Sequence, residues 1–284
     1  MNKKTKQKLA FLLFRLFSII IVGILLSILG FIAFNGIKVI NWEFLSTMPK
    51  EGMTEGGIFP AIVGTCYLII GSLIFAVPLG VMSAIYTVEY AGNGKIVRFI
   101  RMMTNNLASI PSIVFGLFGM ALFVTKLGFG DSILAGSLTL GLLTLPIIIR
   151  TSEEALKAVP ESYRTGSYAL GASKLQTIRK VVLPCAMPNI LTGIILSVSR
   201  VSGETAPILF TVAAYFLPNL PDSIFSQAMA LPYHLYVLAT SGTDIEASRH
   251  MAYGTALVLV VIVLFFNLTA TILRQRLSRK LKNK

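Results

Sequence analysis

An arginine and a glutamate lie four residues apart in the apolar stretch SRVSGETAPI, which runs from Ser199 to Ile208. If this stretch is helical, Arg200 and Glu204 share one helix face and can form an ion pair. A guanidinium suits oxyanions because it donates two parallel hydrogen bonds. Charged side chains inside a membrane are costly, roughly 2.5–3.5 kcal/mol on insertion scales, and by default they indicate a substrate route. The stretch therefore favours an anion pathway over an ion pair that only fixes helix orientation.

Hydroxyl groups and helix-loosening residues surround the charged pair. Gly203 and Pro207 are expected to loosen the helix for a conformational change. Glu204 is expected to restrain Arg200, because a transporter must release the anion that it binds. A latch that opens in one conformation only is the alternative role. The candidate pathway residues are Arg200, Glu204, Ser202 and Thr205.

The elements that would hold these residues are membrane-spanning helices. The chain of 284 residues is 55% hydrophobic and 13% charged, whereas a soluble domain carries about 25% charged residues. About 20 apolar helical residues cross a bilayer. The uncharged stretches predict an all-α, polytopic membrane protein with six transmembrane helices, at residues 16–37, 59–86, 102–124, 133–149, 188–216 and 251–273.

Local patterns refine this plan. The first span, with no clear cleavage site after it, is read as a retained anchor. Residues 95–106 alternate basic and apolar side chains and are expected at the inner interface. Pro111 is expected to bend the third span. The outer loop, residues 217–250, is expected to hold a short apolar helix.

The basic residues indicate the orientation of the chain. The net charge is +13, but 20 of the 25 Lys and Arg residues fall in the segments that are cytoplasmic if the N-terminus is inside, and only four fall in outer segments. This distribution predicts that both termini are cytoplasmic, in a cell membrane. The basic excess is therefore a topology signal, and we expect contact with a lipid bilayer and none with nucleic acid.

The cytoplasmic loop, residues 150–187, is expected to form short helices. Ser152, followed by Glu153 and Glu154, suits the start of a helix, because a serine cap and acidic residues stabilise a first turn. Pro160 is expected to end that helix. With Arg150 nearby, the two glutamates are read as capping residues rather than as an acid–base pair.

The second half of this loop continues the pattern. Residues 162–170 are expected to form another helix, and Gly171 is expected to supply the turn after it. Helical spacing then continues until Pro184, and Cys185 is placed in a loop. A loop of this kind can present a compact helical surface to a cytoplasmic partner, and a solvated hairpin resting on the membrane is the alternative.

This half resembles the coupling motif of ABC importer permeases, which reads E-A-A, three residues, G, nine residues, then I-x-L-P. Gly171 is the motif glycine, and T-G-S stands at the E-A-A positions, which removes one expected charged contact. The resemblance implies that this segment binds a partner ATPase. The candidate coupling residues are Arg164, Thr165, Gly166, Ser167, Gly171, Ala172, Leu183 and Pro184.

Five stretches together resemble the PstA-type permease family of phosphate ABC importers: GGIFPAIVGT, ASIPSIVFG, LPIIIRTSEEALKAVP, YALGASKLQTIRKVVLP and SRVSGETAPILF. The resemblance implies a type I ABC importer permease fold. The expected regions are residues 1–58 (basic tail, first span and first outer loop), residues 59–273 (transmembrane domain) and residues 274–284 (basic cytoplasmic tail).

The resemblance also implies partners. They are a second related permease of the PstC type as a heterodimer, two copies of a cytoplasmic ATPase, and an extracytoplasmic phosphate-binding protein. A permease for another oxyanion, sulfate or molybdate, is the nearest alternative. A channel or membrane scaffold without ATP coupling is a third, which the Gly171–Pro184 motif disfavours.

Other chemistry finds little support in the sequence. The only Gly-Lys pair, Gly94-Lys95, lacks the residues of a phosphate-binding loop. His234 and His250, 16 residues apart, have no cluster of further ligands that would indicate a metal. We therefore expect a transporter subunit with no catalytic residues, no metal and no cofactor, which depends on a partner for ATP hydrolysis.

Overall fold

The computed structural model describes residues 3–92, 94–217, 219–241 and 245–282. These residues are mostly helical, as predicted. In chain order the elements are α1 (Lys3–Gly36), α2 (Trp42–Ser46), β1 (Pro49–Lys50), the 3-10 turn η1 (Glu51–Met53), β2 (Glu55–Gly56), α3 (Phe59–Ile85), the π-helical turn η2 (Tyr86–Tyr90), α4 (Lys95–Ala108), α5 (Ser112–Gly119), the π-helical turn η3 (Met120–Lys126), α6 (Ile133–Lys157), α7 (Glu161–Ala169), α8 (Lys174–Thr177), the π-helical turn η4 (Ile178–Val182), α9 (Leu183–Gly203), α10 (Ala206–Leu209), α11 (Leu231–Thr240) and α12 (Ile245–Lys282).

Five helical segments in the described chain are long and apolar enough to cross a membrane, and a bent pair gives a sixth. The bent pair joins Lys95–Ala108 to Ser112–Lys126 at an angle of 102°. The bend lies where Pro111 was expected to produce one, because proline cannot donate a backbone hydrogen bond. The predicted third span, residues 102–124, is therefore wrong at its start, since α4 runs in a different direction from α5.

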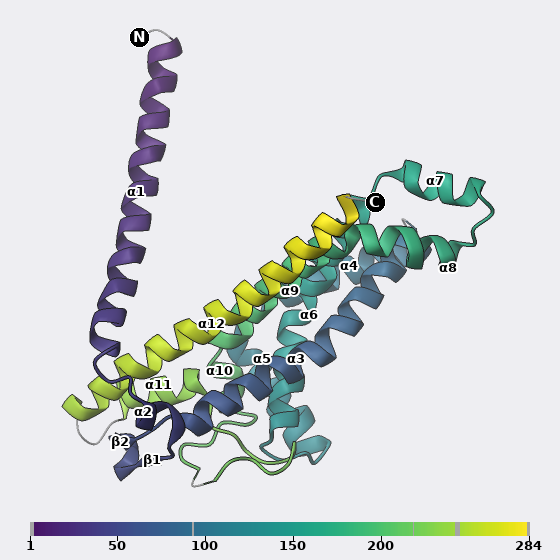
Figure 1. Cartoon of the computed structure of the whole chain (residues 1–284). Helices are drawn as coiled ribbons and strands as arrows, with labels where there is room; N and C mark the ends of the chain where they lie inside the picture. The colour runs from purple at the N-terminus through teal and green to yellow at the C-terminus, as the bar shows by residue number, and fades with distance from the viewer. Residues whose placement is uncertain (1–2, 93, 218, 242–244, 283–284) are drawn as a thin grey trace.

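The long helices form one bundle (Figure 1). Helix α6 packs against α3 and α9, and α9 packs against α12. The α7–α8 hairpin lies at one end of the bundle together with the C-terminal part of α12, and we call this the hairpin end. Helices α2 and α11 and the β1–β2 ribbon lie at the opposite end.

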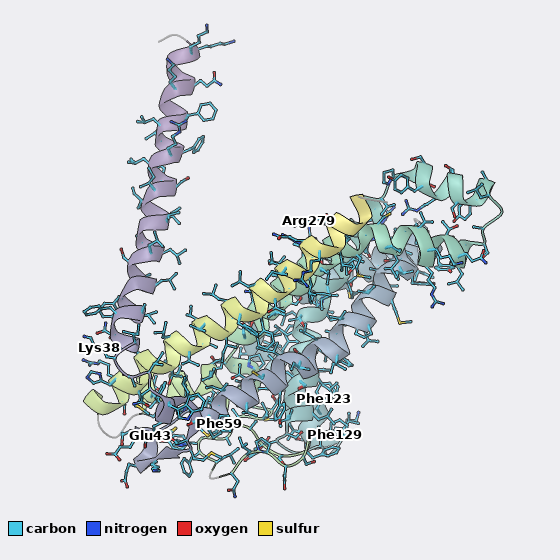
Figure 2. The ribbon with its side chains drawn as sticks, in the orientation of Figure 1. Lys38, Glu43, Phe59, Phe123, Phe129 and Arg279 are labelled. Atoms are coloured by element: carbon cyan, nitrogen blue, oxygen red, sulfur yellow. The ribbon has the colours of Figure 1, made fainter. Side chains whose placement is uncertain are left out.

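Helix α1 diverges from the bundle along most of its length (Figures 1 and 2). It contacts α12 near its C-terminal end, where the rings of Phe31 and Tyr253 are 5.6 Å apart. In the most apolar 18-residue window of Phe11–Gly36 no residue is buried by the described parts of the chain. A helix that is apolar all round needs lipid or another subunit around it.

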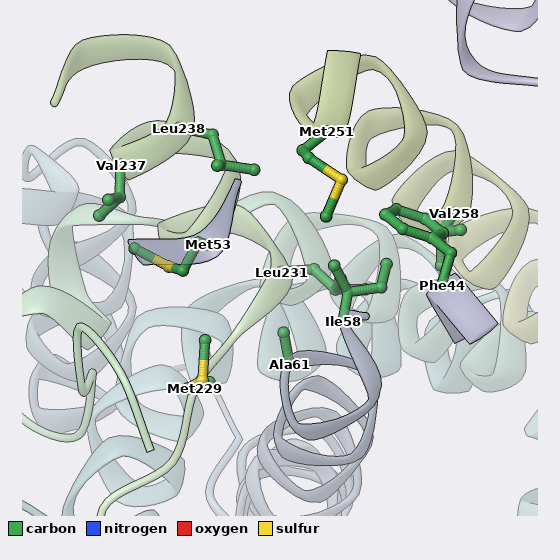
Figure 3. Close-up of a cluster of buried hydrophobic side chains, with 10 residues drawn as sticks. All are labelled: Phe44, Met53, Ile58, Ala61, Met229, Leu231, Val237, Leu238, Met251 and Val258. Carbon is green, nitrogen blue, oxygen red and sulfur yellow. The ribbon is translucent and has the colours of Figure 1, made fainter. Parts of the chain in front are cut away.

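A hydrophobic core closes the end of the bundle opposite the hairpin (Figure 3). It joins the first outer loop, α3, the outer-loop helix α11 and α12. The short helix expected within residues 217–250 is confirmed by α11, which begins with Pro232 in its first turn. The buried members of this core are Phe44, Met53, Ile58, Ala61, Met229, Leu231, Val237, Leu238, Met251 and Val258.

Two expected boundaries at the hairpin end are wrong. Helix α6 continues through Ser152 to Lys157, so Ser152 is a buried residue within a helix and not the start of one. Helix α9 begins directly after η4 and contains Pro184 and Cys185, so the chain has no loop there. Pro184 directly follows the π-helical turn η4, so it interrupts the regular helical hydrogen-bond pattern without ending the segment Lys174–Gly203.

The last helix is also longer than predicted. Helix α12 runs from Ile245 to Lys282, so the residues expected as a separate tail are helical up to Lys282.

Candidate translocation and coupling sites

The predicted fifth span is interrupted beside the charged pair. Helix α9 ends at Gly203, and Glu204 has an extended backbone, with φ −77° and ψ 126°. Pro207 lies in the first turn of α10. Proline has no N–H for the carbonyl of Gly203 and its ring would clash with that carbonyl, which explains why the helix stops there. The expectation that residues 188–216 form one span with Arg200 near its middle is wrong, because Arg200 lies three residues before the end of α9.

The expected ion pair is present at this break. Arg200 Nε and Glu204 Oε1 are 3.4 Å apart, and the two side chains are 34% and 16% exposed. Arg200 Nε is buried and makes no hydrogen bond of good geometry with the described residues. The guanidinium is thus paired by charge, partly open, and able to donate hydrogen bonds to an anion. We call Arg200 to Pro207 the hinge.

The neighbouring hydroxyl groups do not join the pair. Ser202 is buried, and its hydroxyl lies 2.9 Å from the backbone carbonyl of Val198 within α9. Ser199 and Asn267 of α12 share two hydrogen bonds, the shorter being 2.8 Å. Thr205 is partly buried just after the end of α9. The structure brings Arg200 and Glu204 together, and the position of Ser202 argues against a pathway role for its hydroxyl.

The coupling segment has the expected form of two helices joined at a glycine. Helix α7 ends before Gly171, which has φ +80°, a backbone conformation that favours glycine. Ser173 and Gln176 then form a capping box that starts α8. A hydrogen bond of 2.9 Å between the hydroxyls of Ser167 and Thr177 holds the two helices together.

The hairpin presents a mixed apolar surface. Thr165, Gly166 and Gly171 are exposed, whereas Ala172, Leu183 and Pro184 are partly buried. Large apolar side chains beside them are also exposed, most of all Leu170 at 90% and Leu175 at 66%. A group of exposed apolar side chains at this end of the bundle indicates an interaction surface. We define the docking surface as Tyr163, Tyr168, Leu170 and Leu175.

Arg164 does not belong to the docking surface. Its side chain is only 10% exposed, and its Nη2 lies 2.8 Å from Glu89 Oε1. It also donates to the backbone carbonyls of Leu156 (3.0 Å) and Val159 (2.8 Å), near the C-terminal end of α6. The hydrogen bond to Glu89 raises the pKa of Arg164. Arg164 therefore positions the hairpin on the bundle and is not free to contact an ATPase.

Glu153 likewise differs from the capping role expected for it. Its carboxylate is within hydrogen-bond distance of Thr87 on η2, Arg101 on α4 and Lys157 on α6. The burial of the Glu153 and Glu89 carboxylates was not predicted from the sequence. The only signal was indirect, since Glu89 is the first charged residue after the uncharged run of α3.

No group of three or more metal-ligating side chains occurs among the described residues. His234 is buried in α11, and burial lowers its pKa to about 4. Neither of its ring nitrogens has a hydrogen-bond partner in the described chain. His250 is exposed at the start of α12.

Comparison with known proteins agrees with this architecture. The chain is 36% identical to the probable ABC transporter permease protein YqgI of Bacillus subtilis, over 99% of both chains. It is 40% identical to the phosphate transport system permease protein PstA 1 of Mycobacterium tuberculosis, over 79% of this chain and 73% of that one. It is 38% identical to the probable phosphate transport system permease protein PstA of Methanocaldococcus jannaschii, over 75% of this chain and 74% of that one.

Solved structures share the fold. A bacterial ABC transporter involved in import of the acidic polysaccharide alginate contains a chain that matches with a TM-score of 0.63 at 14% identity, over 96% of both chains. The MetNI methionine ABC transporter in an inward-facing conformation matches with a TM-score of 0.58 at 19% identity, over 78% of this chain and 94% of that one. Residues 76–283 match the family described as binding-protein-dependent transport system inner membrane component. The chain is therefore a multi-pass membrane protein that belongs to this family of ABC importer permeases.

Proposed function

We propose that this chain is the permease subunit of an ATP-driven phosphate importer and forms half of its translocation pathway. The observation that carries the proposal is the partly open Arg200 guanidinium at the broken end of a membrane helix, paired with Glu204. The similarity to PstA proteins supports phosphate as the anion. The guanidinium geometry supports an oxyanion in general.

Arg200 contacts the passing phosphate in this proposal. Glu204 competes with the anion for the same guanidinium, so binding stays weak enough for release. The break after Gly203 lets the pair separate and re-form without bending a continuous helix. Thr205, which follows the pair in the hinge, adds a hydroxyl near the route.

The docking surface binds the ATPase. Leu170 and Leu175 project from a compact hairpin whose base is fixed by Arg164 and by the Ser167–Thr177 hydrogen bond. Apolar side chains on a rigid helical knob suit insertion into a groove of a partner. Thr165 and Gly166 offer a small, exposed surface for close approach.

The complete transporter needs further subunits. A related permease of the PstC type forms the other half of the pathway, two ATPase copies bind the two hairpins, and a phosphate-binding protein delivers the anion at the opposite end. The distribution of basic residues supports a cytoplasmic location for both termini and the hairpin. The uncovered α1 supports assembly with another membrane subunit.

The test is uptake by the assembled transporter in proteoliposomes that contain ATP. We expect ATP-dependent accumulation of labelled phosphate that excess unlabelled phosphate abolishes and excess sulfate or molybdate does not. Accumulation of labelled sulfate or molybdate instead would assign the permease to another oxyanion.

The same preparation tests the alternative without ATP coupling. Gly171→Glu places a charged side chain at a positive-φ position in the hairpin, so we expect loss of the co-purified ATPase and of uptake. Phosphate flux that persists without ATP, together with no ATPase bound to the unaltered chain, would instead identify a channel.

A further inference from the structure

A buried charged cluster lies at the hairpin end, where α3, α4, α6 and α7 meet. Its centre is Glu153, whose side chain is 9% exposed. The carboxylate lies 2.7 Å from Thr87 Oγ1, 3.1 Å from Arg101 Nε and 3.3 Å from Lys157 Nζ. One carboxylate of α6 therefore joins this helix to η2 and α4, whose partner residues lie 66 and 52 residues earlier in the sequence.

Stability alone is a poor reason for such an arrangement. A buried ion pair often contributes no more to stability than apolar side chains of the same volume. A satisfied polar network does, however, fix one relative position of the elements that it joins. Glu153 thereby fixes the position of η2 and α4 relative to the end of α6.

Two series of contacts connect Glu153 to other parts of the chain, and we call each of them an arm. The first arm connects Glu153 to the hairpin. Thr87 and Glu89 lie on the same π-helical turn, η2, and π-helical turns often occur at functional positions. Glu89 binds Arg164 of α7 at 2.8 Å, while Thr87 binds Glu153 of α6. A displacement of α7 therefore acts on η2, and through η2 on Glu153.

The other arm leads to the hinge. Arg101 belongs to α4, which continues through the bend at Pro111 into α5. Helix α5 packs closely on α10, since a Cβ atom at Gly116 would lie 3.0 Å from the Ala206 carbonyl oxygen and from Pro207 Cα. Helix α10 begins two residues after Glu204. A displacement of α4 and α5 therefore reaches the hinge directly.

We propose that Glu153 is a positioning residue that couples the place of the α7–α8 hairpin to the conformation of the hinge. The inference rests on the proposed function, because it gives the route by which ATPase movement reaches Arg200 and Glu204. The coupling element is the set of contacts from Arg164 through Glu89, Thr87 and Glu153 to Arg101. Both arms end on one carboxylate, so loss of either arm breaks this route, and the helical connection from α8 through η4 to α9 is the contact that remains between hairpin and hinge.

The test uses Glu153→Gln in the complete transporter with its second permease, ATPase and binding protein. The measured quantity is ATP hydrolysis with the phosphate-loaded binding protein divided by hydrolysis without it. We expect the substitution to lower this ratio at least about fivefold, in the range of ordinary allosteric coupling. Phosphate uptake per ATP hydrolysed should fall with it. A merely structural role would lower the yield of complex without changing the ratio.

Glu154→Gln is the matched control, since its side chain is 69% exposed and lies 3.5 Å from Arg150. Its ratio should equal that of the unaltered chain. Arg101→Gln removes only the arm toward α4 and should lower the ratio as Glu153→Gln does, which keeps the test informative if Glu153→Gln fails to assemble. The double variant should be no worse than either single variant.

A ratio within twofold of the unaltered value in both Glu153→Gln and Arg101→Gln would overturn the proposal. Different results would contradict the phosphate assignment and the role of Glu153. Absence of phosphate uptake by the unaltered complex counts against the phosphate assignment. The hydrolysis ratio, measured with the binding protein and its own anion, tests Glu153 whichever oxyanion is carried.

Discussion

Arg164 and Glu89 are 75 residues apart in the chain and form a buried ion pair of 2.8 Å between α7 of the hairpin and η2, the turn that follows α3. The pair fixes the base of the docking surface, because the same guanidinium also binds two backbone carbonyls near the end of α6. One side chain thereby ties the hairpin to both η2 and the end of α6. The rigidity of this attachment is the physical condition for passing motion from an ATPase to the pathway.

Removal of Arg164 should destabilise the chain strongly. Arg164→Met leaves Glu89 buried and unpaired, which costs about 3–5 kcal/mol in the free energy of unfolding. The double variant Arg164→Met with Glu89→Met should recover much of this loss, since no uncompensated charge remains. Denaturant unfolding in detergent measures both, and Arg179→Met, at an exposed position in η4, is the control. Equal losses in the single and double variants would contradict a buried pair.

Replacement by alanine should have different effects on stability at two glycines of the hairpin. Gly171 has φ +80°, so Gly171→Ala forces an unfavourable backbone and costs about 1–2 kcal/mol. Gly166 lies within α7 with no atom within 4 Å of an added Cβ, so Gly166→Ala should be neutral or stabilise by up to about 1 kcal/mol. Thermal unfolding of the two variants gives the comparison. A Gly171→Ala chain as stable as the Gly166→Ala chain would show that the turn is not fixed by this glycine.

Substitutions on the docking surface should weaken ATPase binding without affecting the fold. Leu170 is 90% exposed, so Leu170→Ser should leave the unfolding temperature unchanged. If the partner buries this side chain, the affinity should fall by about 1.5–3 kcal/mol, which is tenfold or more. Titration of the purified ATPase measures the affinity, with Lys180→Ser at an exposed position of η4 as the control. Unchanged affinity for both Leu170→Ser and Leu175→Ser would place the ATPase elsewhere.

His234 should make stability depend on pH. Burial lowers its pKa from 6.5 to about 4, so the unfolded chain binds a proton between these values and the folded chain does not. Stability is then unaffected above pH 6.5 and falls as the pH drops toward 4, by about 3 kcal/mol in total. Unfolding in detergent between pH 7.5 and 4 should show this fall, and His234→Leu should reduce it. The exposed His250→Leu should retain it. An equal loss of stability at low pH in the unaltered, His234→Leu and His250→Leu chains would mean that His234 does not cause it.

Local sequence signals predicted much of this structure. The uncharged runs gave the spans because a bilayer sets their length. Gly171 predicted a turn because its side chain is absent, and Pro111 predicted the bend because its ring blocks the helical hydrogen bond. The pair of Arg200 and Glu204 was predicted from helical spacing, and it forms although Glu204 lies just beyond the end of α9.

Other features depend on tertiary contacts that spacing does not reveal. Ser152 has the preference of a helix cap, but packing of α6 against its neighbours extends the helix past it. Glu153 was read as a capping residue because its partners Thr87 and Arg101 lie 66 and 52 residues away. The helix break at Gly203 had a visible signal in Pro207, yet the apolar composition of the stretch favoured a continuous span.

The central claim is that phosphate passes the hinge beside Arg200, and uptake by Arg200→Gln in the assembled transporter tests it most directly. At normal protein levels, with the ATPase bound, phosphate uptake should fall at least about tenfold, because a neutral amide replaces a charge-assisted donor worth about 1.5–3 kcal/mol. Arg98→Gln, at an exposed position on α4, should transport normally. Undiminished ATP-driven phosphate uptake by Arg200→Gln would contradict the account.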